Sequence, residues 1–285
     1  MITKQIRLSI VIGDLPLCLY IPNTKSARSW NKLLKPYLCS AVKDFLFILN
    51  LELNSIKSKK TNSIKNRLET ITRYSDDFYS LNLEFLTFYG SLSYRPKRYE
   101  GNMYVFRDVL PCYNDALWVC LSIICSDRGQ LLLHASGVNI DGRVWLFCGP
   151  SGSGKTTIAL KLRHRGVPFS DDRVIVEPCE DGSLKAFSTP FGSDVLSYRN
   201  AQSGIVEGIC FIEQGDQHRL SLMKQDEIVS KIFPQIACFS RDPSVLDKVM
   251  STISLIAENR YCYSLTFRED ESFWPLLYNL KDKTE

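Results

Sequence analysis

Hydrophobic and polar residues alternate over short stretches in the first third of the chain, which is the period of half-buried strands. The alternation predicts two short strands within residues 5–21 and another at residues 45–53. Residues 54–66 are polar and rich in lysine, which predicts an exposed loop or a mobile linker. Residues 78–109 carry aromatic and β-branched side chains between glycine and proline breaks, which predicts a strand meander. We therefore expect residues 1–110 to form a β-rich N-terminal region that recognises a substrate or partner.

Two longer segments show helical spacing instead. Residues 114–126 are apolar on nearly every side, which is typical of a buried helix, and Asn114 is placed to cap it. Asp242 and Pro243 precede apolar residues spaced three and four apart, which predicts an amphipathic helix that covers the core. We expect residues 111–285 to form one domain that mixes strands and helices, an α/β (α+β) fold.

Two apolar strands within residues 130–148 are joined by Asp141 and Gly142. This dipeptide predicts a two-residue hairpin turn, since both positions of such a turn need positive φ. If the residues flanking the turn pair with each other, the numbers of paired residues sum to 283, and His134 lies opposite Gly149. The hairpin is therefore expected to place a histidine beside the loop that follows its second strand.

That loop is rich in glycine and precedes a helical segment. Its sequence, GPSGSGKT, matches the pattern G-x-x-x-x-G-K-[ST] of loops that cradle nucleotide phosphates, in the required strand–loop–helix context. Glycines let backbone N–H groups converge on phosphate oxygens, the lysine neutralises phosphate charge, and the hydroxyl after it binds Mg²⁺. The alternative is a glycine-rich helix start whose lysine binds nothing. The expected nucleotide-binding residues are Gly149, Ser151, Gly152, Ser153, Gly154, Lys155, Thr156 and Thr157.

The segment after the loop points to two carboxylates. A helix over residues 155–165 is about 16 Å long and ends at Gly166, a natural C′ residue. A right-handed crossover makes the next strand, residues 167–171, parallel to the strand before the loop, and it returns to the level of the loop. Asp171 and Asp172 then arrive beside the phosphates on opposite faces, one facing the phosphates and the other approaching Mg²⁺ or backbone. The alternative is that Asp171 and Asp172 only form a solvated turn and bind nothing.

Composition and charge exclude some classes of function. The net charge of +4 is too small to indicate a nucleic-acid partner. Residues 1–75 nevertheless hold 13 Lys and Arg against 4 Asp and Glu, which forms either a solvated lysine face or a surface that attracts an acidic partner. The longest uncharged apolar run, Ala116 to Cys125, is about half of a bilayer span, and no leader precedes it. We expect a cytoplasmic chain without a membrane span, whose ten scattered cysteines are reduced thiols.

His134, the loop GPSGSGKTT and the segment RGVPFSDDRV together resemble the catalytic domain of HPr kinase/phosphorylase, whose ATP-binding core is shared with phosphoenolpyruvate carboxykinases. The similarity is close over residues 130–180 and loose over residues 130–285. It is nearest to shorter, divergent HPr-kinase-like proteins, some of which look like serine kinases of peptide-modifying gene clusters, including those of lasso peptides.

The resemblance implies a P-loop core with a mixed sheet, and a homo-oligomer that is a hexamer in the family. It implies that Lys155 and Thr156 hold ATP and Mg²⁺, that Asp172 is the general base, and that His134 supports the site. Asp171 is the second expected metal ligand. The family's LEIRG-type segment, which supplies a metal-binding glutamate and leads to a catalytic arginine, is not recognisable, and STPFGSD and AQSGIVEGICFIEQG stand in that region.

We therefore expect an ATP-dependent kinase that transfers the γ-phosphoryl group to a hydroxyl, a serine of a peptide or small protein. The expected catalytic residues are Asp172, His134 and Lys155. A small-molecule hydroxyl kinase with the same core and a non-catalytic ATP-binding regulatory subunit remain open alternatives.

Three other polar residues receive simpler interpretations. His164 at the end of the predicted helix and His218 in a polar turn are expected to be surface residues rather than ligands. Glu213 ends the apolar run ICFIE, which has the form of the acidic strand of ATPases, but an ordinary core strand is the preferred interpretation.

Overall fold

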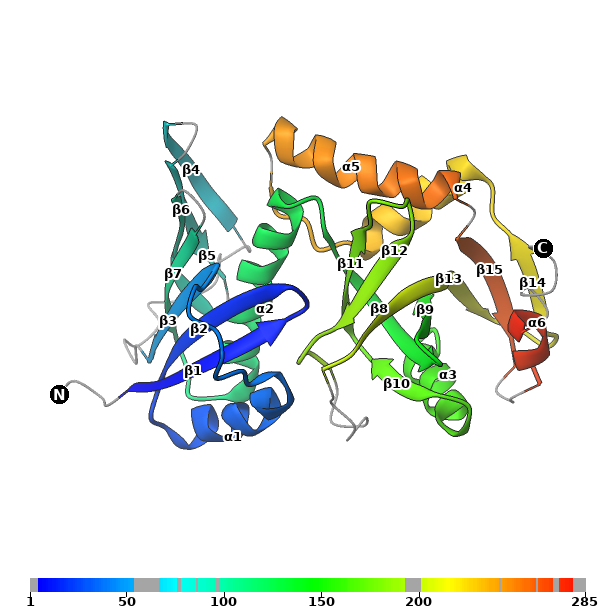
Figure 1. Ribbon diagram of the computed structural model, residues 1–285, viewed down its shortest axis with the longest axis horizontal. Coiled ribbons are helices and arrows are strands. Elements are labelled where there is room, and N and C mark those ends of the chain that lie inside the picture. Colours follow the sequence, from blue (N-terminus) through cyan, green and yellow to red (C-terminus); the bar gives the residue numbers. More distant parts are fainter. Residues whose placement is uncertain are drawn as a thin grey trace, which may run out of the picture. The chain divides into compact units, whose positions relative to one another are not determined.

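The structure is a computed structural model that divides into two compact units, Met1–Ile124 (unit 1) and Cys125–Glu285 (unit 2) (Figure 1). The polar segment 54–66, predicted as a loop or linker, lies outside the described residues. Among the residues that are described, no helix has the length and apolar character needed to cross a membrane. The structure describes residues 5–53, 67–75, 78–85, 87–95, 98–192, 201–240, 242–259, 261–268 and 272–278.

The strands described in unit 1 form a seven-stranded sheet in the order β1-β2-β3-β7-β6-β5-β4. β1 and β2 pair as a hairpin, and β5, β6 and β7 form an antiparallel meander, as the alternation predicted. β3 runs parallel to both of its neighbours, so the sheet is mixed. The strands are β1 (Gln5–Ile12), β2 (Leu15–Pro22), β3 (Phe47–Leu53), β4 (Arg67–Ser75), β5 (Phe78–Glu84), β6 (Phe88–Arg95) and β7 (Arg98–Val105).

The sequence analysis missed a helix in unit 1, α1 (Lys25–Leu34), which continues into the 3₁₀ turn η1 (Lys35–Tyr37). Thr24 caps α1, because its Oγ1 accepts a hydrogen bond from the backbone N–H of Ala27 at 3.2 Å. Ala27, Trp30 and Leu34 are the buried residues of α1 and lie on one face. Their spacing of three and four residues is the signal that marks this helix in the sequence.

The predicted buried helix exists as α2 (Leu110–Asp127), but it begins earlier than expected. Asn114 therefore lies inside the helix, and the prediction that it caps the helix is wrong. Its Oδ1 instead accepts a hydrogen bond of 2.7 Å from the indole N–H of Trp30. Asn114 thus accepts the hydrogen bond of the buried Trp30 indole and does not cap its own helix. The tertiary structure brings α1 and α2 together, so the sequence pattern could not show this contact.

Unit 2 is built on an eight-stranded mixed sheet in the order β10-β8-β11-β12-β13-β15-β14, with β9 paired to both β8 and β13. β9 is antiparallel to β8 and parallel to β13. The strands are β8 (Leu131–Ile140), β9 (Arg143–Cys148), β10 (Val167–Ser170), β11 (Arg173–Pro178), β12 (Leu184–Ser188), β13 (Ser203–Gln214), β14 (Arg219–Leu222) and β15 (Cys262–Phe267). The β-rich N-terminal unit and this mixed sheet confirm the α+β class.

The hairpin of β8 and β9 has the predicted turn and register. Asp141 has φ 53° and Gly142 has φ 83°, the left-handed values that a two-residue turn needs. Residue pairs from Ile140–Arg143 to Ala135–Cys148 follow the predicted sum. The hairpin thus brings the first half of β8, which contains His134, to the start of the glycine loop.

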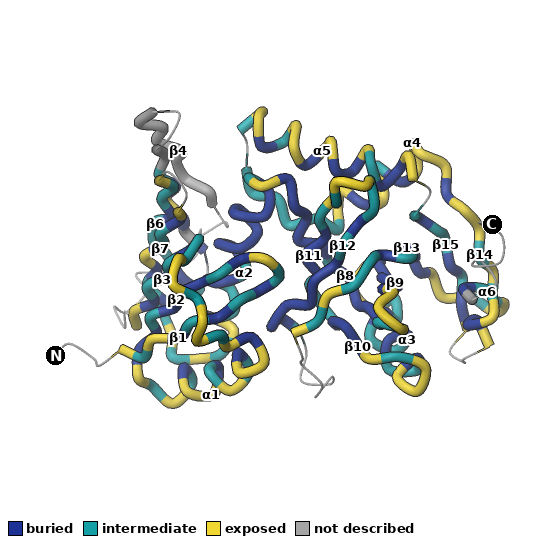
Figure 2. Tube along the Cα trace, in the orientation of Figure 1, coloured by how far each residue is buried: buried dark blue, intermediate teal, exposed yellow. Residues whose placement is uncertain are grey.

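Helices cover both faces of the sheet in unit 2. Figure 1 shows α4 and α5 on one side and α3 on the other. Figure 2 shows that α5 is buried along one face and exposed along the other, as its amphipathic pattern predicted. Asp242 caps α5, since its Oδ1 accepts from the N–H of Ser244 at 2.9 Å. The helices and 3₁₀ turns are α3 (Lys155–Lys161), η2 (Leu162–His164), α4 (Gln225–Ile232), η3 (Phe233–Gln235), α5 (Pro243–Glu258) and α6 (Trp274–Tyr278).

The helix after the glycine loop differs from the prediction in two ways. It is α-helical only to Lys161 and ends as the 3₁₀ turn η2. Gly166 does not have positive φ, so it is not a left-handed cap. A methyl group at Gly166 would overlap the carbonyl oxygen of Asn139, and glycine is needed there because the chain passes close to β8.

Candidate functional site

The glycine loop connects β9 to α3 through a backbone that only glycine adopts easily. Gly152 and Gly154 have φ of 81° and 97°, in the left-handed region. A Cβ on Gly154 would also lie 2.7 Å from the Phe267 ring. The strand–loop–helix arrangement inferred from the sequence is therefore present, and two of its glycines are required by conformation.

Lys155 begins α3 and its side chain turns back into the loop. Its Nζ donates hydrogen bonds to the carbonyl oxygens of Gly149 at 2.8 Å and Pro150 at 2.9 Å. The Lys155 backbone carbonyl accepts a hydrogen bond of 2.7 Å from Ser136 Oγ, which ties the start of α3 to β8. The residue is buried, and burial lowers the pKa of its amine, although the nearby carboxylate of Asp172 partly offsets this. A buried cation is thus held at the centre of the loop.

The hydroxyls of the loop have different surroundings. Ser153 Oγ is buried and has no hydrogen-bond partner among the residues that the structure describes. A buried hydroxyl without a partner costs free energy, so this oxygen is suited to bind a group that enters the loop. Ser151 is exposed, whereas Thr156 and Thr157 are half-buried in the first turn of α3.

β10 brings the two aspartates to the loop, by a route that differs in detail from the prediction. β10 ends at Ser170, so Asp171 and Asp172 lie in the bend after the strand and not in it. β10 and β9 point in the same direction, as predicted, but β8 lies between them and pairs antiparallel with both. The backbone carbonyl of Asp172 accepts a hydrogen bond of 3.1 Å from the N–H of Ala135 on β8.

The Asp172 carboxylate lies among positively charged or hydrogen-bonding groups. His134 Nε2 is 3.3 Å from Asp172 Oδ1, and Arg173 Nε is 3.6 Å from Oδ2. Burial alone would raise the pKa of Asp172, but the hydrogen bond from His134 and the charges of Arg173 and Lys155 outweigh it and hold the pKa below its usual value. Asp172 is therefore ionised at neutral pH.

His134 and Arg173 reach Asp172 because they are paired residues of neighbouring strands, β8 and β11. The position of His134 was predicted from the sequence, whereas that of Arg173 was not. Arg173 directly follows the aspartate pair in the sequence, but this position does not show that its guanidinium turns back to the Asp172 carboxylate. The structure thus brings together Asp172, His134 and Lys155, the three expected catalytic residues, and adds an arginine.

Asp171 points elsewhere. Its carboxylate lies against Gly192, and a methyl group built on Gly192 would overlap Asp171 Oδ1. Gly192 has φ 150°, a conformation that residues with a side chain rarely adopt. The two neighbouring carboxylates therefore face different surroundings, and that of Asp171 lies against Gly192.

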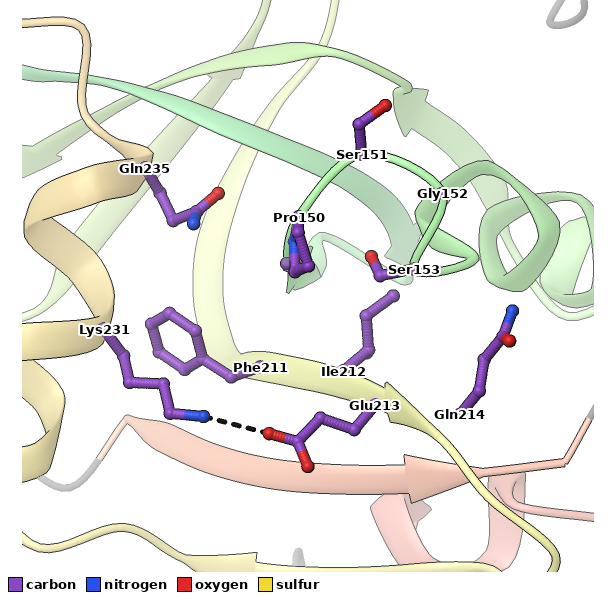
Figure 3. Close-up of a pocket in the computed structure, with 11 residues that line it drawn as sticks. Pro150, Ser151, Gly152, Ser153, Phe211, Ile212, Glu213, Gln214, Lys231 and Gln235 are labelled. Atoms are coloured by element: carbon purple, nitrogen blue, oxygen red, sulfur yellow. Dashed lines mark hydrogen bonds and ion pairs between the residues drawn. The ribbon is translucent and has the colours of Figure 1, made fainter.

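A pocket of about 520 Å³ lies between the glycine loop and the end of β13 (Figure 3). Its walls are the loop, the end of β13, Lys231 of α4 and Gln235 of η3. Lys231 Nζ forms an ion pair of 3.0 Å with Glu213 Oε1 at the rim. β13 is a core strand, as expected, but the interpretation of its last residues as only core was incomplete, since Glu213 is exposed and lines this pocket.

The other histidines lie outside this site. His164 is exposed at the end of η2, as expected. His218 is partly buried, accepts a hydrogen bond of 3.3 Å from the N–H of Arg268 and contacts the ring of Phe273. All ten cysteines are free thiols.

Comparisons with known proteins give limited matches. A family model described as SynChlorMet cassette protein ScmC matches residues 114–234, which include the glycine loop and the aspartate pair. No curated protein matches the chain. Among solved structures, the chain is similar to the Hpr(Ser) kinase/phosphatase from Coxiella burnetii, with 10% sequence identity, a TM-score of 0.28, and coverage of 54% of this chain and 95% of that chain. The function of the site is therefore argued from its own geometry.

Proposed function

We propose that unit 2 is an ATP-dependent kinase that transfers the γ-phosphoryl group to a hydroxyl, and that the acceptor is a serine of a peptide or small protein. The observation that carries the proposal is the position of Asp172. An ionised carboxylate, oriented by His134 and Arg173, lies close enough to Lys155 to affect its pKa. Phosphoryl transfer to a hydroxyl needs this pair of functions, a cation for the phosphates and a carboxylate for the proton.

Several features support phosphate binding in the loop. Among the described residues, Lys155 Nζ donates hydrogen bonds to two carbonyls of the loop itself, and phosphate oxygens are stronger acceptors for a buried ammonium. Ser153 Oγ has no hydrogen-bond partner in the described part of the chain, and a bound phosphate would supply one. Gly152 and Gly154 have positive φ and no side chain, which lets a phosphate approach the loop backbone closely. These groups fit the β- and γ-phosphates of ATP.

Thr156, in the first turn of α3, would hold Mg²⁺ bound together with ATP, and the ion would neutralise charge on the phosphates. Asp171 is the second proposed ligand, which requires its carboxylate to turn away from Gly192 toward the ion. Mg²⁺ takes most of its ligands from phosphates and water in such sites, so two protein oxygens suffice. Among the described residues, no group of three His, Cys, Asp or Glu side chains is arranged to bind a metal ion without a nucleotide.

The proton of the acceptor hydroxyl goes to Asp172. The lowered pKa makes this carboxylate a weak base, but it ensures that the acceptor oxygen meets an ionised group at neutral pH. In a loose transition state the hydroxyl becomes strongly acidic only as the new P–O bond forms, so a weak base can still take the proton. His134 holds Oδ1 and Arg173 lies beside Oδ2, which restricts the rotation of the carboxylate.

The experiment that tests this proposal measures ADP release by the purified chain with Mg²⁺-ATP and serine-containing peptides, with serine-to-alanine peptides as the matched control. Release that depends on the serine, with phosphoserine found by mass spectrometry, supports the proposal. Release that depends on small hydroxyl compounds and not on peptides would assign a small-molecule kinase. ATP binding without turnover on any acceptor would contradict kinase activity and leave a regulatory subunit.

A further inference from the structure

The pocket beside the glycine loop lies on the opposite side of β9 from the catalytic groups. β9 leads into the loop and has β8 on one edge and β13 on the other. The backbone of Asp172 is hydrogen-bonded to β8, whereas the pocket is built on the last residues of β13. A ligand whose terminal phosphate lies near Asp172 could therefore extend across the loop toward β13 and this pocket.

The size and lining of the pocket match a group that is flat, apolar on its faces and polar at its edges. Its volume of about 520 Å³ lies within the range of about 300–1,000 Å³ that is usual for small-molecule sites. Pro150, Phe211 and Ile212 supply apolar surface. Figure 3 shows the amide of Gln235 directed toward Pro150, across from the end of β13. Amide side chains can pair with the edge of a nucleobase, and apolar rings can pack on its face.

Glu213, which forms an ion pair with Lys231, provides a hydrogen-bond acceptor at the rim of this pocket. Both side chains are about half exposed, with relative areas of 58% and 46%. An ion pair this exposed adds little to the stability of a fold. A carboxylate in such a position accepts hydrogen bonds from ribose hydroxyls, as acidic residues do in many nucleotide sites.

We propose that this pocket binds the nucleoside part of the ligand, with Glu213 accepting hydrogen bonds from the ribose hydroxyls while Lys231 holds its carboxylate in place. The inference rests on the proposed function, because it assumes that the triphosphate lies in the glycine loop. It names the ligand class as a ribonucleoside triphosphate and assigns ribose selectivity to Glu213. The Glu213–Lys231 pair acts in binding and takes no part in phosphoryl transfer.

The test compares three probes, ATP, 2′-deoxy-ATP and inorganic tripolyphosphate, by calorimetric titration with Mg²⁺. Wild-type protein is expected to bind ATP more tightly than either of the other two. Glu213→Ala is expected to weaken ATP binding about tenfold, to remove the preference for ATP over 2′-deoxy-ATP, and to leave tripolyphosphate binding unchanged. Glu207→Ala is the matched control, since Glu207 also lies on β13 and pairs with Arg143 at 3.6 Å but does not line the pocket.

Two results would overturn the inference without touching the proposed function. One is equal binding of ATP and tripolyphosphate by wild-type protein, because the nucleoside would then contribute nothing. The other is an unchanged preference for ATP over 2′-deoxy-ATP in Glu213→Ala. Failure of all three probes to bind, or binding that Lys155→Ala leaves unchanged, would instead overturn the phosphate site itself and the inference with it.

Discussion

His134 Nε2, on β8, lies 3.3 Å from Oδ1 of Asp172, in the bend after β10. The hydrogen bond from His134 lowers the pKa of Asp172, so His134→Ala is expected to raise it. If Asp172 must be ionised to act, the acid side of the profile of kcat/KM against pH should then move to higher pH. His164→Ala changes an exposed histidine and should leave the profile unchanged. An unmoved acid side in His134→Ala would show that His134 does not tune the carboxylate.

Lys155→Ala should remove most of the ATP affinity and keep the fold. Within the described part of the chain, the Lys155 side chain donates its hydrogen bonds to the loop carbonyls of Gly149 and Pro150. Loss of a charge-assisted hydrogen bond to phosphate, typically about 1.5–3 kcal/mol, corresponds to a loss of affinity of about 10- to 100-fold. Calorimetry and a melting curve measure the two effects. Lys161→Ala, on the same helix, is the control, and an unchanged affinity in Lys155→Ala would remove the phosphate-binding account.

The lowered pKa of Lys155 predicts a pH dependence of binding. Because burial lowers this pKa, the free protein loses the Lys155 proton at a lower pH than an exposed lysine, whose value is 10.5. Bound phosphate favours the protonated amine, so ATP binding should take up protons and weaken as the pH rises toward that value. Calorimetry in buffers of different ionisation enthalpy measures the uptake. The same uptake in Lys155→Ala would assign it to another group.

The sequence predicted the parts of this site that local rules determine. Asp141 and Gly142 fix a turn that needs positive φ, and the turn fixes the register that carries His134 to the glycine loop. The helix and short strand after the loop likewise bring Asp172 back to it. In each case the decisive residues lie within a few positions of one another.

Contacts between distant segments were not predictable in this way. Gly192 contacts Asp171, and Lys231 reaches Glu213, through tertiary packing that no spacing in the sequence records. Asn114 was predicted to cap α2 because its residue type favours helix caps. It lies inside the helix and accepts a hydrogen bond from Trp30. The positions of His134, Lys155 and Asp172 were therefore visible in the sequence, whereas the pocket beside β13 was not.

Gly192→Ala should disturb the metal site without destroying the protein. The added methyl group would overlap the Asp171 carboxylate and displace it, so Mg²⁺-ATP should bind more weakly and added Mg²⁺ should restore part of the affinity. Gly182→Ala is a matched control, because Gly182 also has positive φ but has open space around its Cα. Equal loss of Mg²⁺-ATP affinity in both variants would attribute the effect to backbone strain and not to Asp171.

Asp171 and Asp172 should fail differently when each is changed to Asn. Asp171→Asn should weaken Mg²⁺-ATP binding in a way that extra Mg²⁺ partly reverses, because it removes a proposed ligand of the ion. Asp172→Asn should leave binding nearly intact and slow the transfer, because it removes the proton acceptor. A titration of Mg²⁺ against rate separates the two. Exchanged behaviour of the variants would reverse the assignment within the pair.

The most direct measurement of the central claim is the single-turnover rate of phosphoryl transfer by Asp172→Asn, with ATP saturating and the true acceptor present. Removal of a general base typically slows the chemical step by about 10²- to 10⁴-fold. The account predicts a loss in that range, with ATP affinity close to that of the wild type. A rate close to that of the wild type would contradict the kinase mechanism and leave the chain as a nucleotide-binding module.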